Sequence, residues 1–326
     1  MNKRMRQTVC VVIAAMLGPC AAGTAVAQAY PTKPIRVIAA GTPGGSIDFI
    51  ARIVSQKASG TLGQQMIVDN RGGGGGNLGA EMTARSAPDG YTVLLIGASL
   101  AINPSLYSKL AYDPAKDFAP ITQTTASGFI LAVPAGLAAK SVKDLVALAK
   151  SKKDGMAYAS PGSGQAQHLG MELFATRAGF KAVHIPYKGG APAVSAVVSG
   201  ESDVTLASVP SALPLLQAGK LKSIAVSSLK RIALLPEVPT VAESGFPGFE
   251  VSGWIGYLAP AGTPRDILKR LHEEIAKGLR QPDVQETLKA TGQETVASTP
   301  DEFAVYIRTE LIKWDKVAKQ SGAKVD

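Results

Sequence analysis

Cysteine is almost absent from this chain, and histidine is scarce. Its 326 residues include two cysteines, Cys10 and Cys20, both close to the N-terminus, and three histidines. His168, His184 and His272 are too far apart to form the H-x-x-x-H or H-E-x-x-H pairs that bind zinc. Beyond residue 27, disulfides, cysteine nucleophiles and cysteine-ligated metals are therefore excluded. We expect no metal site and no cofactor.

Long apolar runs are also lacking, apart from one near the N-terminus. Three basic residues among the first six precede an apolar run over 9–22, and small residues lead from there to Ala27. This run is too short to span a bilayer, which takes roughly 18 residues or more, and the order is that of a secretory signal peptide. We predict that residues 1–27 are removed by cleavage after Ala27 and that the protein is exported. Lipid anchoring at Cys20 is a disfavoured alternative, because Pro19 precedes that cysteine.

Clusters of like charge are missing from the remainder of the chain. Three of the 34 Lys and Arg residues lie in residues 1–27, so residues 28–326 hold 31 basic and 25 acidic residues, a net charge of +6. The basic residues are scattered singly, without interleaved aromatic residues, so we expect no nucleic-acid partner. The length that remains predicts about two domains of roughly 150 residues each.

Strand-like and helix-like patterns alternate along almost the whole chain. We predict strands over 34–40, 65–70, 92–97, 129–133, 156–160, 183–187, 203–207, 223–227 and 251–259. We predict helices over 46–63, 77–86, 142–150, 165–178, 264–280, 282–291 and 300–321. Such alternation is typical of βαβ units and mostly parallel sheets, so the predicted fold class is α/β.

The pattern restarts after a proline-rich stretch over 103–120, which indicates two lobes. We predict that residues 28–128 and 251–326 form lobe 1 and that residues 129–250 form lobe 2. The chain then crosses near residue 128 and returns near residue 250. Two crossings make a hinge, and lobes joined in this way close around a ligand in a central cleft.

A glycine-rich turn over 41–48 links the first predicted strand to its helix. Glycines leave the backbone uncovered, and Ser46 suits the start of a helix, so the amides of Gly44, Gly45 and Ser46 are expected to bind an anion. Asp48 falls in the first helical turn, where a carboxylate suits the helix dipole, and we interpret its role as structural. The candidate binding residues of this turn are Thr42, Pro43, Gly44, Gly45, Ser46 and Asp48.

A second turn of the same design follows the strand over 156–160, so each predicted lobe has one. In open α/β sheets ligands bind beyond the carboxyl ends of strands, and both turns lie at such ends. We predict that the two turns hold one anion between them. The candidates here are Ser160, Gly162, Ser163, Gly164, Gln165 and His168, and further strand ends add Ala98, Ser99, Tyr187 and Ser208.

Two other motifs have alternative interpretations. The glycines over 74–79 fit G-x-G-x-x-G, but no acidic residue ends the following strand, so we interpret them as a flexible turn and not as a dinucleotide site. Ser99 lies in a near match to the nucleophile elbow G-x-S-x-G, with Asp203 and His272 in the order of a hydrolase triad. An exported serine hydrolase using Ser99 is therefore the alternative function.

Several blocks of the sequence resemble the Bug family, the extracytoplasmic receptors of tripartite tricarboxylate transporters. The blocks are YPTKPIR (30–36), PGG with Asp48 (43–48), APDGYT (87–92), AINP (101–104), YDP with KDF (112–118), PYKG (186–189) and VPT with Glu243 (238–243). The resemblance implies a two-lobed periplasmic type II binding-protein fold, in which the loops 43–46 and 160–164 bind a ligand carboxylate with ordered waters. It implies a monomer that captures its ligand without chemistry and delivers it to membrane permease subunits or to a sensor protein.

Two positions depart from what such receptors often carry. Gly41 stands where many have a bulky aromatic residue, and Ala207 stands where many have an acidic residue. We therefore expect a roomier and less acidic pocket, which favours a larger or more anionic carboxylate over a ligand with an ammonium group.

Overall fold

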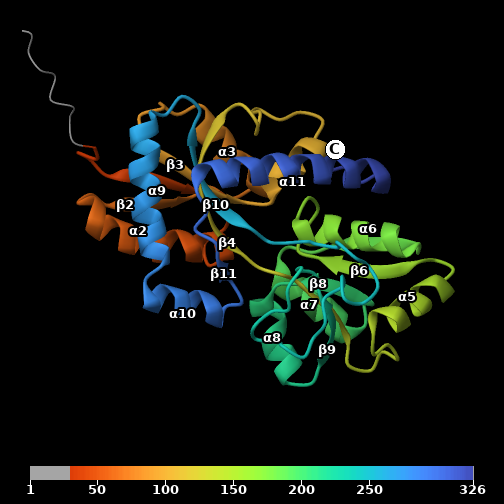
Figure 1. Ribbon diagram of the computed structural model, residues 1–326. Helices are drawn as coiled ribbons and strands as arrows, with labels where there is room; N and C mark the ends of the chain where they lie inside the picture. The colour runs from red at the N-terminus through yellow and green to blue at the C-terminus, as the bar shows by residue number, and fades with distance from the viewer. Residues whose placement is uncertain (1–29, 326) are drawn as a thin grey trace, which may run out of the picture.

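The computed structural model describes residues 30–325, which form two α/β lobes joined by two chain crossings (Figure 1). The two-lobed fold class predicted from the sequence is confirmed. The predicted signal peptide, residues 1–27, lies outside the described residues. Within residues 30–325, no helix combines the length and the apolar character needed to cross a bilayer.

The first sheet, which defines lobe 1 here, has the strand order β11-β4-β10-β3-β1-β2. Strand β1 is parallel to β2 and to β3, whereas β10 runs antiparallel to both β3 and β4. Parallel strands buried on both faces are expected to read as continuous apolar runs, and β1 has the sequence IRVIA. The strands are β1 (Ile35–Ala39), β2 (Met66–Asn70), β3 (Thr92–Gly97), β4 (Phe118–Ala126), β10 (Ile255–Pro260) and β11 (Glu294–Thr295).

Helices cover both faces of the first sheet. On one side α2 packs against α9. Helix α11 is partly solvated, and it begins with a capping box between Thr299 and Glu302. The helical elements of lobe 1 are α2 (Ser46–Leu62), η1 (Gly74–Gly76), α3 (Asn77–Ala84), α4 (Ser99–Ile102), η2 (Asn103–Ser105), α9 (Arg265–Leu279), α10 (Pro282–Ala290) and α11 (Pro300–Ser321).

The second sheet, which defines lobe 2, has the order β7-β6-β8-β5-β9. Strand β6 is parallel to β7 and β8, and β5 runs antiparallel to β8 and β9. Its elements are β5 (Ile130–Pro134), α5 (Val142–Ser151), β6 (Met156–Ser160), α6 (Ala166–Ala178), β7 (Ala182–Pro186), α7 (Gly190–Ser199), β8 (Val204–Ala207), α8 (Val209–Gln217) and β9 (Leu221–Val226).

The two crossings run side by side between the lobes. The chain passes from β4 of lobe 1 to β5 of lobe 2 after Ala126, and it returns from β9 of lobe 2 to β10 of lobe 1 before Ile255. The crossings are bonded to each other, because the Gly253 amide donates to the Ser127 carbonyl at 2.8 Å and Gly128 pairs with Ser252 in an isolated bridge. The predicted boundaries at 128/129 and 250/251 fall within these intervals, and we retain them as a proposal.

Helix α11 also connects the lobes. It lies alongside α6 of lobe 2 (Figure 1), and one apolar core includes Phe174 of α6 together with Trp314 of α11. Glu310 of α11 is 2% exposed, and its carboxylate accepts hydrogen bonds from the indoles of Trp254 at 3.1 Å and Trp314 at 2.9 Å. The carboxylate is also paired with Lys313. The C-terminal helix is thus anchored at the centre of the molecule.

Strand β4 and helices α7 and α8 are the longer elements absent from the sequence prediction, and each contains proline. The short elements η1, α4, η2 and β11 were not predicted either. Strand β4 contains Pro120, which is tolerated because β11 pairs with β4 only at Thr125 and Ala126 and leaves position 120 on a free edge. Helices α7 and α8 carry prolines in their first turns, and α8 has Pro214 inside. Proline in the first helical turn costs little, since those amides have no partner within the helix.

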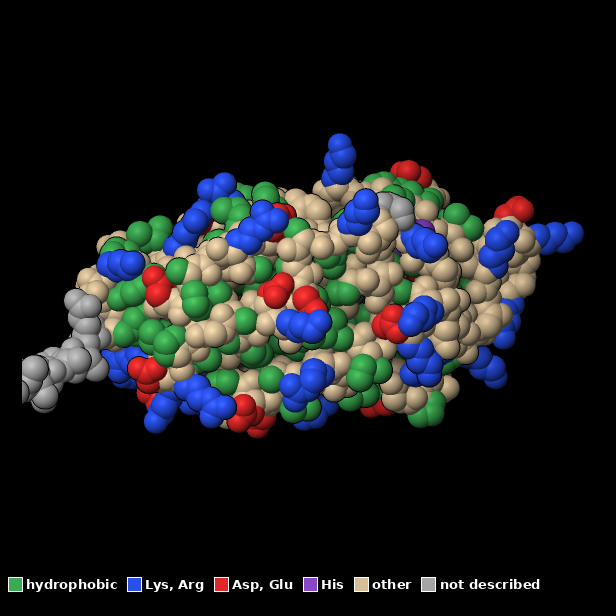
Figure 2. Space-filling view, turned by 90° about the horizontal axis from the view of Figure 1, so that it is seen from above, with side chains coloured by type: hydrophobic (Ala, Val, Ile, Leu, Met, Phe, Trp, Pro, Cys, Tyr) green, Lys and Arg blue, Asp and Glu red, His purple; other side chains and the backbone are tan. Residues whose placement is uncertain are grey.

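The surface is mixed in charge. On the face seen in Figure 2, lysines and arginines are interspersed with acidic and apolar side chains. The view agrees with the scattered basic residues of the sequence.

Candidate functional site

Two adjoining cavities lie between the lobes. The hinge-side cavity, of about 440 Å³, reaches from the turn before α2 to the crossings at Phe129 and Trp254. The glycine-loop cavity, of about 510 Å³, reaches from the same turn to Gly72, Gly73, Gly75 and Gly76 on lobe 1 and Lys188 on lobe 2. Both cavities are lined by Gly45, Ser46, Ile47, Ser99, Pro161 and Gln165. Together they form one cleft, and each lobe supplies part of its wall.

The turn before α2 uses two of its amides internally. The Gly44 amide donates to Asp48 Oδ2 at 2.9 Å, and the Gly45 amide donates to the Thr42 carbonyl at 3.1 Å. The amides of Ser46 and Ile47, the first two of the helix, have no acceptor within residues 30–325. Both residues line the cleft, so these amides, and not those of Gly44 and Gly45, are the ones free to bind an anion.

Asp48 stabilises this turn by accepting the hydrogen bond from Gly44, and it does not line the cleft. Its side chain is 7% exposed and pairs with Arg52 at 2.9 Å. Burial alone would raise the pKa of this carboxyl, but the hydrogen bonds from Arg52 and Gly44 outweigh it and hold the pKa below its ordinary value. The carboxylate therefore stays charged and fixes the loop.

The second turn is fixed from behind by two stacked histidines. Ser160 is fully buried, and its Oγ lies 2.6 Å from His184 Nε2. His168 Nδ1 accepts from the Gly164 amide at 3.2 Å, and the two rings stack with centroids 3.9 Å apart. Burial, together with the neighbouring His184, lowers the pKa of His168 to about 3, and burial lowers the pKa of His184 to about 4. Both rings are neutral at pH 7 and act as supports of the loop.

The cleft brings together part of the predicted site. The predicted site residues that line the cleft are Thr42, Gly44, Gly45, Ser46, Ala98, Ser99, Gln165 and Ser208. Those that do not line it are Pro43, Asp48, Ser160, Gly162, Ser163, Gly164, His168 and Tyr187. The second group belongs mainly to the supports of the two turns, and the ligand contacts of the first group remain a prediction.

The lining residues that the sequence prediction omits include residues of the crossings, the α10–β11 turn, the glycine loop and the starts of α7 and α8, as well as Lys188. The crossings supply Ser127, Phe129, Gly253 and Trp254, and the α10–β11 turn supplies Thr291 and Gln293. The glycine loop, Gly72–Gly76, borders the cleft although the sequence suggested only a flexible turn. Lys188 belongs to the PYKG block (186–189) that resembles the receptor family, and this block was the sequence feature that could have indicated it. Neither cavity is lined by an acidic residue, and Lys188 is the sole charged residue among those that line them.

The two departures from the family pattern have different outcomes. Gly41 lines the glycine-loop cavity, as expected for a position that affects ligand space. Ala207 is 3% exposed, packs in the core of lobe 2 and lines neither cavity. The expectation that Ala207 shapes the pocket was wrong, because the residue at the end of β8 points into the core and the cleft begins at Ser208.

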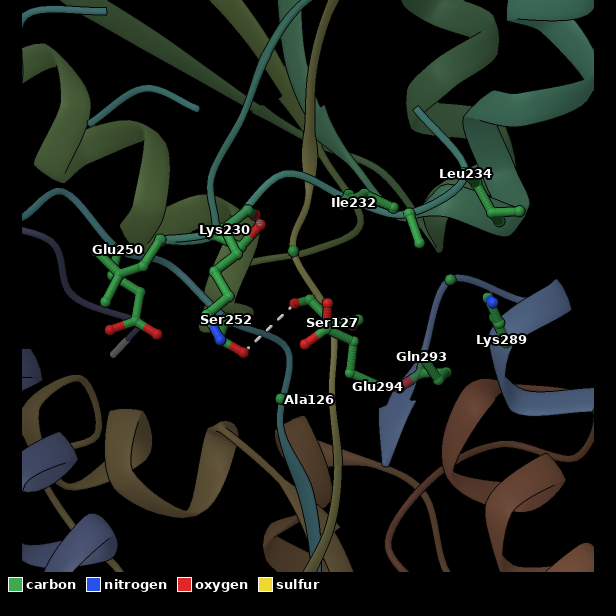
Figure 3. Close-up of a pocket in the computed structure, with 15 residues that line it drawn as sticks. Ala126, Ser127, Lys230, Ile232, Leu234, Glu250, Ser252, Lys289, Gln293 and Glu294 are labelled. Carbon is green, nitrogen blue, oxygen red and sulfur yellow. Dashed lines mark hydrogen bonds between the residues drawn. The ribbon is translucent and has the colours of Figure 1, made fainter. Parts of the chain in front are cut away.

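A third cavity, of about 280 Å³, lies beside the crossings (Figure 3). Lys289, Gln293 and Glu294 of lobe 1 face Ile232 and Leu234 of lobe 2 across it. Acidic and basic side chains both line this cavity, so it has no preference for an anion, in contrast to the cleft. Ser127 and Gln293 separate it from the hinge-side cavity.

The hydrolase triad is not assembled. Asp203 pairs with Lys152 at 2.5 Å and accepts from the Ala157 amide at 2.9 Å, all within lobe 2. His272 lies on α9 of lobe 1, and neither residue lines the cavities that contain Ser99. In the part of the chain that the structure describes, no cluster of three metal-ligating side chains is found.

The profile described as "Tripartite tricarboxylate transporter family receptor" matches residues 50–323. The chain belongs to this receptor family. It is 36% identical to Protein BugT of Bordetella pertussis over 301 residues, which cover 92% of each chain. Receptors of this family are periplasmic binding proteins, and their two-lobed architecture is that of the present chain.

Two solved structures of the receptor family illustrate the likeness. Rpa4515 of R. palustris, with adipate, superposes with a TM-score of 0.81 at 33% identity, covering 91% of this chain and all of that one. MatC from Rhodopseudomonas palustris, with bound malate, has a TM-score of 0.76 at 30% identity, covering 88% of this chain and 99% of that one.

Proposed function

We propose that this chain is a periplasmic receptor that captures a small carboxylate between its lobes and performs no reaction on it. The observation that carries the proposal is the pair of free amides at Ser46 and Ile47, at the N-terminus of a helix in a cleft without acidic side chains. Such amides, together with the helix dipole, bind oxyanions.

The opposite wall of the cleft completes the grip. Pro161 and Gln165 of lobe 2 line both cavities, and Ser208 of lobe 2 offers a hydroxyl group opposite that of Ser99 on lobe 1. A carboxylate on the Ser46 amide therefore lies within a wall contributed by both lobes, and its capture favours the closed arrangement. The relatives bound to adipate and malate support a carboxylate as the ligand.

The proposed function implies the membrane permease subunits of a tripartite tricarboxylate transporter as partners. We propose that the receptor is monomeric, is exported by its N-terminal signal and delivers its ligand to these subunits. Among residues 30–325 no histidine lines the cavities that contain Ser99, so no base for its hydroxyl is found there, which supports binding without hydrolysis.

The test replaces one backbone donor and leaves the fold intact. Ser46 is the first residue of α2, where proline is tolerated, and Gly45 before it is extended (φ −81°, ψ 170°), as a residue before proline should be. Ser46→Pro removes the amide hydrogen, whereas Ser46→Ala removes only the hydroxyl. With a carboxylate found by calorimetry or by mass spectrometry of copurified ligand, we expect Ser46→Pro to weaken binding about tenfold or more.

Unchanged affinity in Ser46→Pro, with an unchanged melting temperature, would contradict the proposed anion site. Ser99→Ala separates the alternative: a hydrolase would lose ester turnover completely, and a receptor would only bind its ligand less tightly.

A further inference from the structure

Gln293 has a buried polar atom without a partner at the hinge end of the cleft. It lies in the turn between α10 and β11 of lobe 1, and with Ser127 of the crossings it lines both the hinge-side cavity and the third cavity (Figure 3). The residue is 8% exposed, and its Oε1 accepts no hydrogen bond from any group of residues 30–325. An unpaired buried acceptor destabilises the fold, because folding removes it from water without replacing the lost hydrogen bond.

The hydroxyl groups around Gln293 have acceptors of their own. Ser127 Oγ donates to the Gly253 carbonyl at 3.2 Å. Thr291 Oγ1 donates to the Leu288 carbonyl at 2.8 Å. Since a hydroxyl group has a single hydrogen, neither of them is free to donate to Gln293. The donor for its Oε1 therefore has to come from outside the described chain.

The hinge-side cavity has apolar walls and no charge. None of the residues that line it is acidic or basic, and its apolar side chains include Ile47, Phe129, Val209, Trp254 and Ile255. The glycine-loop cavity is lined mainly by glycines and offers less apolar surface. Burial of apolar surface favours binding, so the body of a ligand held at the Ser46 amide extends towards the hinge, where Gln293 lies.

We propose that Gln293 is a specificity-determining residue, which accepts a hydrogen bond from a neutral polar group at the far end of the ligand. This inference rests on the proposed function, in which a carboxylate binds at the Ser46 and Ile47 amides. The ligand class is then a monocarboxylate with an apolar middle and a hydroxyl or carboxamide group at its other end.

A second charged group at the hinge end is disfavoured for two reasons. A carboxylate has no hydrogen to donate to Gln293 Oε1. A carboxylate or an ammonium group would also be buried in a cavity whose lining has no opposite charge. A hydroxyl group meets neither obstacle, so Gln293 favours a neutral end over a charged one.

The experiment compares three series of acids by calorimetry. Linear ω-hydroxy acids of three to eight carbons are titrated, each beside the unsubstituted monoacid and the α,ω-diacid of the same chain length. The variants are Gln293→Leu, which removes the hydrogen-bonding atoms at similar volume, and Gln293→Glu, which keeps the shape and adds a negative charge. Gln285→Leu is the matched control, since Gln285 is exposed on α10 of the same lobe and lines none of the three cavities.

We expect the native protein to bind at least one ω-hydroxy acid about fivefold or more tightly than the unsubstituted acid and the diacid of the same length. In Gln293→Leu the ratio of hydroxy-acid to unsubstituted-acid affinity falls towards one, and in Gln285→Leu it equals that of the native protein. Gln293→Glu should instead favour the ω-amino acid of that length, because its carboxylate pairs with the ammonium group. A residue that only supports the turn would change all affinities by the same factor.

Two results would overturn this role of Gln293. The first is a preference for the hydroxy acid that persists in Gln293→Leu. The second is a native protein that binds the hydroxy acid no more tightly than the unsubstituted acid or the diacid. Both leave the proposed carboxylate receptor standing, because binding of the unsubstituted acid still reports the Ser46 site. A native protein that binds none of the three series counts against the proposed function as well.

Discussion

The imidazole rings of His168 and His184 lie parallel within 12°, with their centroids 3.9 Å apart, directly behind the second turn of the cleft. The ring of Tyr158 lies nearly parallel to both, 5.0 Å from His184 and 6.4 Å from His168, and its hydroxyl donates to Glu172. Two cationic rings at this separation would repel each other in a buried site, so the stack requires neutral histidines. The stack thereby connects pH to the loop that forms one wall of the cleft.

The free energy of unfolding should therefore decrease as the pH is lowered through a defined window. The pKa of both rings is lowered, to about 3 and about 4, from 6.5 in the unfolded chain, so the unfolded state takes up protons that the folded state does not. The contribution is complete above about pH 6.5 and is lost as pH falls towards 4. Urea unfolding measured between pH 7 and 4.5 should show this decline. In His184→Phe the decline should be shallower, and a free energy of unfolding that is independent of pH in the native protein would contradict the argument.

Gly45→Val should block the cleft. Gly45 lines both cavities and has an ordinary φ of −81°, so the backbone allows a branched side chain there, whose Cβ would lie 3.2 Å from the Thr42 carbonyl. Gly44 is less suited to this test, because its φ of 77° strains any side chain. We expect calorimetry to show loss of carboxylate binding in Gly45→Val with a melting temperature within a few degrees of the native protein. Retained affinity would mean that the ligand lies elsewhere.

Gly292→Ala should separate the lobes. A methyl group on Gly292 of lobe 1 would lie 2.7 Å from Val209 Cγ2 of lobe 2. Gly219 provides the control, because its φ of 65° resembles the 71° of Gly292 and no atom lies within 4 Å of its added methyl group. Small-angle scattering should give a larger radius of gyration for Gly292→Ala, with weaker ligand binding, and native values for Gly219→Ala. Equal behaviour of the two variants would show that strain alone is responsible.

Glu310→Ala should destabilise the whole molecule. The substitution leaves the indole N–H groups of Trp254 and Trp314 without an acceptor in a buried site, which costs about 2–4 kcal/mol. Glu310→Gln keeps one acceptor oxygen and should lose less. The free energy of unfolding in urea measures both, and a loss in Glu310→Ala no larger than that in Glu310→Gln would contradict this role.

Much of the architecture follows from local patterns. The β-branched strands and amphipathic helices predict the α/β class, and the glycine turns after β1 and β6 are placed at the carboxyl ends of strands, where the cleft is found. Local patterns did not predict strand β4 and helices α7 and α8, because prolines usually interrupt strands and helices. Here the prolines lie at a sheet edge or in a first helical turn, where they are tolerated.

The site required contacts between residues that are distant in the chain. Sequence reasoning placed Ser160 and His168 at the ligand, but His184 binds Ser160 from behind and turns both residues into supports. It placed the anion on the amides of Gly44, Gly45 and Ser46, of which the first two are occupied by Asp48 and Thr42. Lys188 entered only as part of a motif.

Composition and periodicity along the chain were sufficient for the fold class and for placing the two glycine turns, and the resemblance of several sequence blocks indicated the receptor family. The tertiary structure alone revealed which amides remain free and which cation borders the cleft. The physical reason is that periodicity depends on neighbours a few residues apart, whereas a free donor or an unpaired charge depends on every group that folding brings near it, as Asp48 and Thr42 do for the amides of Gly44 and Gly45.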